Sequence, residues 1–382
     1  MRDFDLALRD RLDTLDRQGR RRFLRPVERL DGRVLVDGRA LIDFSSNDSL
    51  GLADHPDLKR RAGLWAERFG AGATASRLVC GGSAAAHALE ARIAALKRFE
   101  AALILASGFQ ANGAVLAALL DRRVAGAEPM VFADRLAHAS MHHGIAAAGL
   151  RQIRYRHGDL DHLDALLTAR RGRAGLRLIV TETVFSMDGD VSDVAALVAL
   201  ARRHGALLYL DEAHATGVMG PGGAGLGAGA DIVMGTFGKA LGGFGAYVAC
   251  SALLRDWLVN ACGGLIYSTA PPPAVLGAIE AALDLLPGLE PERAKVAALA
   301  ERLRGALRGF DTGRSASHIV PVILGDEARA LEVARGLEAR GFLAIAIRPP
   351  TVPTARLRLS VSARHTPEQI DALALAIIEL AG

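Results

Sequence analysis

A carboxylate and a lysine stand 28 residues apart, each directly after an apolar run typical of a buried strand. Asp211 follows ALLYL and begins DEAH (211–214), and Lys239 lies in TFGKALGG (236–243) after DIVMG. An amine in crowded, weakly polar surroundings has a lowered pKa and can act as nucleophile and base. A carboxylate at a strand end can keep a heteroaromatic ring nitrogen protonated. Asp211 could also be a solvated strand end. Lys239 could bind phosphate, although the full phosphate-binding loop G-x-x-x-x-G-K-[ST] is missing.

The other lysines do not compete with Lys239 for this chemistry. Only four of the 46 basic residues are lysines, and Lys59, Lys97 and Lys295 stand in charged helical patterns. We expect those three to be solvated, which leaves Lys239 alone among small and apolar neighbours.

Two further segments add groups that could hold a ligand. SGFQANG (107–113) reads as a strand turning into a helix, where backbone N–H groups form an anion site, although a simple turn is equally compatible. His138 in DRLAHAS (134–140), taken alone, is better explained as a packed core residue. Together the groups match one ligand. A lysine suits an aldehyde, a carboxylate a ring nitrogen, a helix start with Thr236 a phosphate, and His138 a ring face. That ligand is pyridoxal 5′-phosphate.

The elements that must position these residues alternate in type along the chain. From about residue 50 to 285, apolar strand-like runs such as AALILAS, MVFAD and RLIVTET alternate with helical patterns, among them a helix expected over 192–204. This order predicts an α/β fold with a mostly parallel sheet covered by helices. The runs end in polar residues, and ligands bind beyond the carboxyl ends of parallel strands. We therefore expect one common rim.

The chain divides into three parts by pattern. We predict an N-terminal segment (1–48), a large cofactor-binding domain (49–287) and a smaller α+β domain (288–382). In the last part, Arg356 and Arg358 alternate with leucines, which is typical of a half-buried strand.

Composition excludes several classes of protein. With 51% hydrophobic and 23% charged residues the chain is neither disordered nor a small disulfide scaffold, and a net charge of +4 does not indicate a nucleic-acid partner. The arginine cluster at residues 20–25 could meet an anionic ligand or form a solvated helix face. Three cysteines without metal-ligand spacing favour buried thiols and no bound metal. No apolar signal core or membrane span is apparent, so we expect a cytoplasmic protein.

Seven segments in order resemble the α-oxoamine synthases, pyridoxal-phosphate enzymes of fold type I. The motifs are FSSNDSLGL (44–52), GATASRLVCGG (72–82), ASGFQANGA (106–114), DRLAHAS (134–140), TETVFSMDGD (181–190), DEAHATGVMG (211–220) and TFGKALGG (236–243). With RPPTVPTARLRLS (348–360), the resemblance covers essentially the whole chain.

The segment IRPPTVP (347–353) is most similar to the branch of this family that condenses L-alanine with a pimeloyl thioester. The resemblance implies release of carbon dioxide and of the thiol of coenzyme A or acyl carrier protein. It also implies a homodimer.

Other substrate pairs within the family are glycine with acetyl-CoA or succinyl-CoA, and serine with a long acyl chain. A non-catalytic subunit on this fold is disfavoured because Lys239 is present. A nicotinamide-dependent dehydrogenase is disfavoured because the required G-x-G-x-x-G is missing.

The resemblance assigns the cofactor contacts by motif. Lys239 would bond to the cofactor aldehyde, Asp211 would pair with the ring nitrogen, and His214 with Ser186 would bind the ring oxygen. The backbone of Gly108 and Phe109 would hold the phosphate together with the Thr236 hydroxyl, and His138 would cover the ring face.

Substrate contacts follow from the same resemblance. Arg358 would bind the amino-acid carboxylate, and Asn47, Glu182, His138 and Thr351 would also contact substrate. Arg20 or Arg21 would meet the acyl end. Ser49 departs from the family tyrosine, and the link from Pro353 to Arg356 is about two residues shorter than usual.

Overall fold

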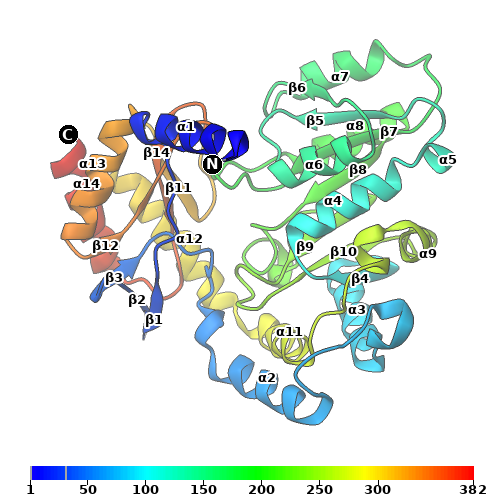
Figure 1. Cartoon of the computed structure of the whole chain (residues 1–382), viewed down its shortest axis with the longest axis horizontal. Helices are drawn as coiled ribbons and strands as arrows, with labels where there is room; N and C mark the ends of the chain where they lie inside the picture. Colours follow the sequence, from blue (N-terminus) through cyan, green and yellow to red (C-terminus); the bar gives the residue numbers. More distant parts are fainter. Residues whose placement is uncertain (1, 31) are drawn as a thin grey trace.

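A computed structural model describes residues 2–30 and 32–382, and its centre is a seven-stranded sheet (Figure 1). The strand order is β4-β10-β9-β8-β7-β5-β6, and every neighbouring pair is parallel except the two that β10 makes. The predicted mostly parallel sheet is confirmed. Its strands are β4 (Ala101–Leu105), β5 (Met130–Asp134), β6 (Ile153–Tyr155), β7 (Arg177–Glu182), β8 (Leu207–Asp211), β9 (Ile232–Thr236) and β10 (Ala246–Cys250).

Both faces of this sheet are buried because successive side chains of a strand point to opposite faces. Leu178 and Val180 of β7 enter one core with α4, α6 and α9, whereas Ile179 enters another with α7 and α8. A third core joins β4 and β10 to α2, α3 and α11. The helices are α2 (Pro56–Phe69), α3 (Ala84–Lys97), α4 (Gly108–Leu119), α5 (Arg122–Ala125), α6 (Ala139–Ala147), α7 (Leu160–Thr168), α8 (Val194–His204), α9 (Ala252–Ala261), α10 (Gly263–Ile266) and α11 (Pro273–Leu285).

A smaller α+β unit follows. Its sheet has the order β11-β14-β13, and its core lies between this sheet and three helices. The elements are α12 (Glu290–Ala306), β11 (Ile319–Gly325), α13 (Glu327–Ala339), β12 (Phe342–Leu343), β13 (Ile345–Ile347), β14 (Ala355–Ser360) and α14 (Pro367–Ala381).

The N-terminal strands join this smaller unit. The antiparallel ribbon β1 (Glu28–Leu30), β2 (Arg33–Val36) and β3 (Arg39–Asp43) continues into β12, which pairs parallel to β3. Phe44, fully buried after β3, stacks on His365 with ring centroids 4.0 Å apart. Figure 1 shows the ribbon in blue beside the orange and red C-terminal helices. Helix α1 (Asp3–Arg17) buries none of its residues. The boundaries predicted at 48/49 and 287/288 stay a prediction.

Four details correct the expectations from the sequence. Lys97 is not solvated: it is 6% exposed and pairs with Glu212, whose carboxylate also accepts backbone N–H bonds from residues 226–227. Strand β14 is buried on both faces because the loop at residues 186–188 covers its arginine side. Cys80 is exposed, while the other two cysteines are buried. Helix α8 begins at Val194, later than expected, with Asp193 as its cap.

Within 2–30 and 32–382, no helix has the length and apolar character needed to cross a membrane. The same residues contain no group of three or more His, Cys, Asp or Glu placed to hold a metal ion.

Candidate active site

A cleft of about 920 Å³ lies where the large sheet, the segment after β3 and the smaller unit meet. Its walls combine the loops that follow β5, β7, β8 and β9 with β13, β14 and the loop between them. The structure therefore brings together residues that are 311 positions apart, such as Asn47 and Arg358. The predicted site residues that line it are Asn47, His138, Ser186, His214, Lys239, Thr351 and Arg358.

Lys239 lies in the turn after β9 and reaches into the cleft. Its Nζ is 2.7 Å from Nε2 of His214. Burial lowers the pKa of Lys239 to about 8, and the charge of Arg358 adds to this effect although Asp211 and Glu182 oppose it. The uncharged fraction of the amine near neutral pH is therefore much larger than for an ordinary lysine, as a nucleophile requires.

His214 follows β8 and is buried beside the lysine. Burial holds its pKa well below the ordinary value, and the positive charge of Lys239 acts in the same direction, so the ring is neutral. Its Nδ1 is buried with no hydrogen-bond partner among the described residues. A buried polar atom of this kind is costly unless a ligand satisfies it.

Asp211 and Glu182 lie side by side behind the cleft. They occupy paired positions at the carboxyl ends of β8 and β7, and both are nearly fully buried. Oδ2 of Asp211 accepts a hydrogen bond of 2.7 Å from Asn112, and Oδ1 accepts one of 2.8 Å from the N–H of Ala213. Burial, reinforced by the charge of Asp211, raises the pKa of Glu182 well above its usual range. Neither carboxylate is among the cleft-lining residues.

The expected anion site is the N-terminus of α4. Ser107 caps this helix by accepting the N–H of Gln110, and the N–H groups of Gly108 and Phe109 in its first turn have no intrahelical acceptor. Thr236 ends β9 in the same edge of the sheet, two strands away from β4. Its hydroxyl donates to the carbonyl of Gly245 and accepts from the N–H of Gly238.

His138 caps α6 and faces the cleft. Its Nδ1 lies 2.7 Å from Oγ of Ser140. Desolvation lowers the pKa of His138, as do the charges of Lys239 and His142, whereas Asp211 raises it. The ring is exposed at the cleft surface, so the role of a packed core residue does not apply.

Arg358 is a buried cation that could bind an anionic ligand. Its Nε donates to the carbonyl of Ser186 (2.6 Å), and Nη2 donates to Oδ1 of Asn47 (2.9 Å). No carboxylate in the part of the chain that the structure describes forms an ion pair with it. Burial lowers its pKa to about 10, which leaves the guanidinium charged at neutral pH.

The N-terminal arginines 20–22 bind different partners. Arg20 pairs with Glu327 and Arg21 with Asp16, each at 2.5 Å, and neither lines the cleft. Their neighbour Arg22 instead donates a 3.1 Å hydrogen bond to Oγ1 of Thr351, which does line it. Sequence reasoning therefore missed Arg22, which only its place in the arginine cluster could have suggested.

Comparison with known proteins identifies the family of the chain. A model of the aminotransferase class I and II family matches residues 39–377. The 8-amino-7-oxononanoate synthase of Gluconacetobacter diazotrophicus is 58% identical over 100% of this chain and 98% of its own length. That of Anaeromyxobacter dehalogenans is 46% identical over 96% of this chain and 93% of its own. The chain belongs to the aminotransferase class I and II family.

Solved structures give the same result for the fold. A serine palmitoyltransferase from S. paucimobilis, with bound PLP–myriocin, has a TM-score of 0.90 and 28% identity over 98% of this chain and 97% of that one. The 8-amino-7-oxononanoate synthase from Francisella tularensis has a TM-score of 0.76 and 26% identity, covering 89% and 97%. Within the aminotransferase class I and II family, the chain is a pyridoxal-phosphate-dependent acyltransferase of the α-oxoamine synthase type, as the sequence predicts.

The residues present fit the cofactor of this aminotransferase family, pyridoxal phosphate. Four features stand along one edge of the sheet: an amine of lowered pKa on Lys239, an Nδ1 of His214 with no partner among the described residues, a carboxylate behind them and a free helix N-terminus. Sequence reasoning assigned no role to Asn112, although an asparagine inside a helical pattern is a signal that it serves something other than helix formation.

Proposed function

We propose that this protein condenses L-alanine with a pimeloyl thioester, giving 8-amino-7-oxononanoate, carbon dioxide and free thiol for biotin biosynthesis. The observation that carries the proposal is that one cleft holds both a half-buried Lys239 and a buried Arg358, whose guanidinium forms no ion pair with a carboxylate among the described residues. Support for the substrate pair comes from relatives 46% and 58% identical over nearly full length. The acyl carrier would be coenzyme A or acyl carrier protein.

Bound pyridoxal phosphate supplies an electron sink that stabilises negative charge at the substrate Cα. In this proposal Lys239 would bond to the cofactor, Asp211 would hold its ring nitrogen protonated, and His214 and Ser186 would bind its ring oxygen. The N–H groups of Gly108 and Phe109 would hold the phosphate together with the Thr236 hydroxyl, whose hydrogen would turn to it from the Gly245 carbonyl. His138 would cover the ring face.

The proton chemistry belongs to Lys239. Nζ of Lys239 would be the base that takes the proton from Cα of alanine. An amine with a pKa of about 8 suits both removing and returning a proton near neutral pH. Because Asp211 is buried and fixed by two hydrogen bonds, its charge stays close to the cofactor site throughout.

Substrate orientation belongs to Arg358. Its guanidinium would bind the alanine carboxylate, while its bonds to Asn47 and to the Ser186 carbonyl fix its direction. Thr351 and Glu182 are proposed to contact substrate as well. At the acyl end we retain Arg20 or Arg21 as the proposed contact, and Arg22 is the arginine whose hydrogen bond reaches a cleft residue.

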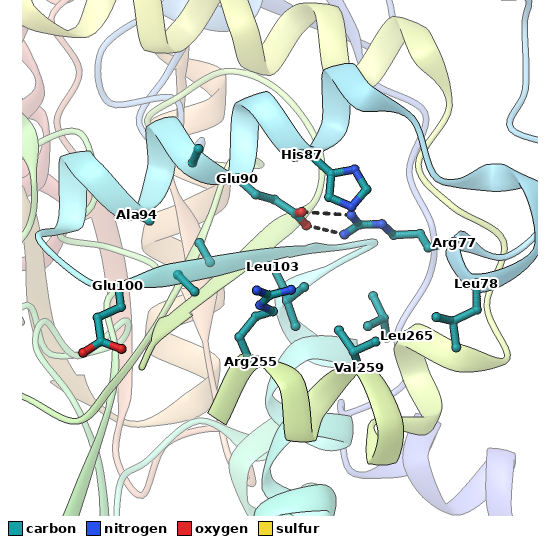
Figure 2. A pocket seen from close by; sticks show the side chains of 13 residues that line it. Arg77, Leu78, His87, Glu90, Ala94, Glu100, Leu103, Arg255, Val259 and Leu265 are labelled. Carbon is teal, nitrogen blue, oxygen red and sulfur yellow. Dashed lines mark hydrogen bonds and ion pairs between the residues drawn. The ribbon is translucent and has the colours of Figure 1, made fainter. Parts of the chain in front are cut away.

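We also propose a homodimer, since large apolar side chains are exposed on contiguous elements. Leu78 and Val79 protrude from the helical turn Arg77–Gly81, which contacts α10; Tyr267 follows α10, and Phe109 begins the neighbouring α4. Val79 and Tyr267 are 78% and 87% exposed. Figure 2 shows Leu78 near Leu265, with the turn anchored by the buried ion pair of Arg77 with Glu90. Exposed apolar patches of this kind mark interfaces, and Phe109 places this one next to the expected cofactor phosphate.

The test is thiol release from pimeloyl-CoA and L-alanine by the purified holoenzyme. We expect release that requires both alanine and Lys239, with Lys239→Ala as the blank. It should exceed release from glycine with acetyl-CoA or succinyl-CoA, and from serine with palmitoyl-CoA. Full turnover by Lys239→Ala would refute the assignment. Greater release with serine and palmitoyl-CoA would favour the activity named for the structures with a TM-score of 0.90. No release with pimeloyl-CoA leads to the same assay with pimeloyl-acyl carrier protein, and failure there excludes the substrate.

A further inference from the structure

A chain of hydrogen bonds behind the cleft joins Asp211 to His138. Its centre is Asn112 on α4, which is 1% exposed. The Asn112 Nδ2 donates to Oδ2 of Asp211 (2.7 Å) and to Oγ of Ser140 (2.9 Å), and its Oδ1 accepts from the hydroxyl of Tyr209 (2.7 Å). Both N–H donors and the carbonyl of the amide are thus engaged, so the side chain has one satisfied orientation.

The chemistry of the partners fixes which way the Asn112 amide points. An ionised carboxylate only accepts hydrogen bonds, so the amide nitrogen must face Asp211. Burial keeps the pKa of Tyr209 well above its usual value, so its phenol stays protonated and donates to the amide oxygen. Exchanging the amide oxygen and nitrogen would place acceptor against acceptor at Asp211.

The same logic continues from Asn112 through Ser140 to His138. Since Oγ of Ser140 accepts from Asn112, its single hydroxyl hydrogen is available for Nδ1 of His138, 2.7 Å away. The backbone N–H of Ser140 points at the same nitrogen (3.3 Å). A ring nitrogen that accepts two donors carries no proton, so the proton of neutral His138 is on Nε2.

We propose that Asn112 and Ser140 are positioning residues that fix the tautomer and orientation of His138 and couple that ring to the Asp211 carboxylate. This inference rests on the proposed function in one respect: the roles that it assigns to His138 and Asp211 in the site. Side-chain networks in a low-dielectric interior strengthen one another, and a half-satisfied network is costly. Removing one member therefore affects both ends.

The charged groups around His138 set the background for a test. Asp211 raises its pKa, Lys239 and His142 lower it, and Glu182 lies close to its backbone. Donation from the Ser140 hydroxyl to Nδ1 favours the neutral ring. Ser140→Ala removes that donor, so the His138 pKa should rise by about one unit, the size expected for one lost hydrogen bond.

The experiment is ¹⁵N NMR of histidine-labelled full-length protein, with and without pyridoxal phosphate, over a pH series. The His138 signals are assigned through their loss in His138→Asn. In the wild type we expect an unprotonated Nδ1 and a protonated Nε2. Ser140→Ala should mix the tautomers and raise the titration midpoint, and Ser140→Thr, which keeps a hydroxyl, should restore both. Thr216→Val is the matched control, because it removes another buried hydroxyl bond, the one to Tyr247 (2.7 Å).

Asn112→Leu tests the same chain of hydrogen bonds from the Asp211 side. It also covers the case in which Ser140→Ala fails to fold. It should move the His138 midpoint in the same direction and lower kcat by about tenfold with a smaller change in KM. Unchanged His138 signals in Ser140→Ala and Asn112→Leu, or an equal change in Thr216→Val, would overturn the proposal. The NMR measurement needs no substrate, so its failure is distinct from failure of the thiol-release assay.

Discussion

At the scale of single residues, burial has different consequences for the charges of two basic side chains in the site. Lys239 loses part of its charge because burial outweighs the nearby carboxylates, which lowers its pKa to about 8. Arg358 keeps its charge even though burial lowers its pKa to about 10. One cleft therefore holds an amine that can exchange protons beside a guanidinium that cannot.

Asp211→Asn is the sharpest substitution at this scale. A neutral amide cannot hold a ring nitrogen protonated, so we expect partial retention of pyridoxal phosphate and a fall in turnover of about a hundredfold or more. Cofactor absorbance and thiol release measure the two effects separately. Asp231→Asn is the control, because Asp231 accepts the N–H of Leu208 at the opposite end of β8, away from the cleft. Turnover close to wild type in Asp211→Asn would remove Asp211 from the proposed role.

Single residues also mark where sequence reasoning ends. Lys239, His214 and Asp211 could be placed together because strand ends meet at one edge of a parallel sheet. Lys97 could not be placed, since its partner Glu212 lies 115 residues away. Asn112 stood in a recognised motif, yet its three partners come from other elements, and only the folded chain brings them within bonding distance.

At the scale of elements, the loops beyond the sheet are held by a buried ion triad. His157, after β6, lies between Asp134 at the end of β5 (3.0 Å) and Asp190 after β7 (2.7 Å), and packs edge-on against Phe185. Burial alone would lower the pKa of His157, but hydrogen bonds to the two carboxylates outweigh it and raise the pKa to about 9. The triad thus connects three loops, one of which carries Ser186.

This triad predicts a pH-dependent stability. An ordinary histidine has a pKa of about 6.5 when unfolded, so the stabilisation is complete below that pH and is lost as pH rises through about 9. We expect the loss of unfolding free energy in His157→Asn to be larger at pH 6 than at pH 10, by on the order of 3 kcal/mol. Urea unfolding at both pH values measures it, with exposed His87→Asn as control. Equal losses at the two pH values would contradict this account.

Elements were predicted better than their surroundings. The five strongest apolar runs became β4, β5, β7, β8 and β9, because period and length suffice to identify buried strands. Strand β14 was correctly expected but not its burial, since the loop that covers Arg356 and Arg358 comes from the large sheet. Alternating polar residues predict a strand with one polar face. They cannot show that a loop from elsewhere in the chain supplies polar partners and buries that face.

At the scale of the whole molecule, the exposed patch of Leu78, Val79, Phe109 and Tyr267 predicts self-association. Sedimentation should give about twice the chain mass of 40.1 kDa. A carboxylate placed in an apolar interface is strongly unfavourable, so Val79→Asp and Tyr267→Asp should shift the protein towards the monomer. Leu375→Asp on α14 is the control, as an apolar side chain outside the patch that is 57% exposed. A wild-type monomer with full turnover would rule the dimer out.

The pairing of β3 with β12 links residues 300 positions apart, as between Ile42 and Phe342. During synthesis the ribbon β1–β3 leaves the ribosome first, yet the residues that bury Phe44 are made among the last. The large sheet lies wholly between them and has its own cores. We therefore expect the middle of the chain to fold first and the ribbon to wait for its partner. Asn47 and Arg358 then meet late, so the cleft is the last part of the protein to be completed.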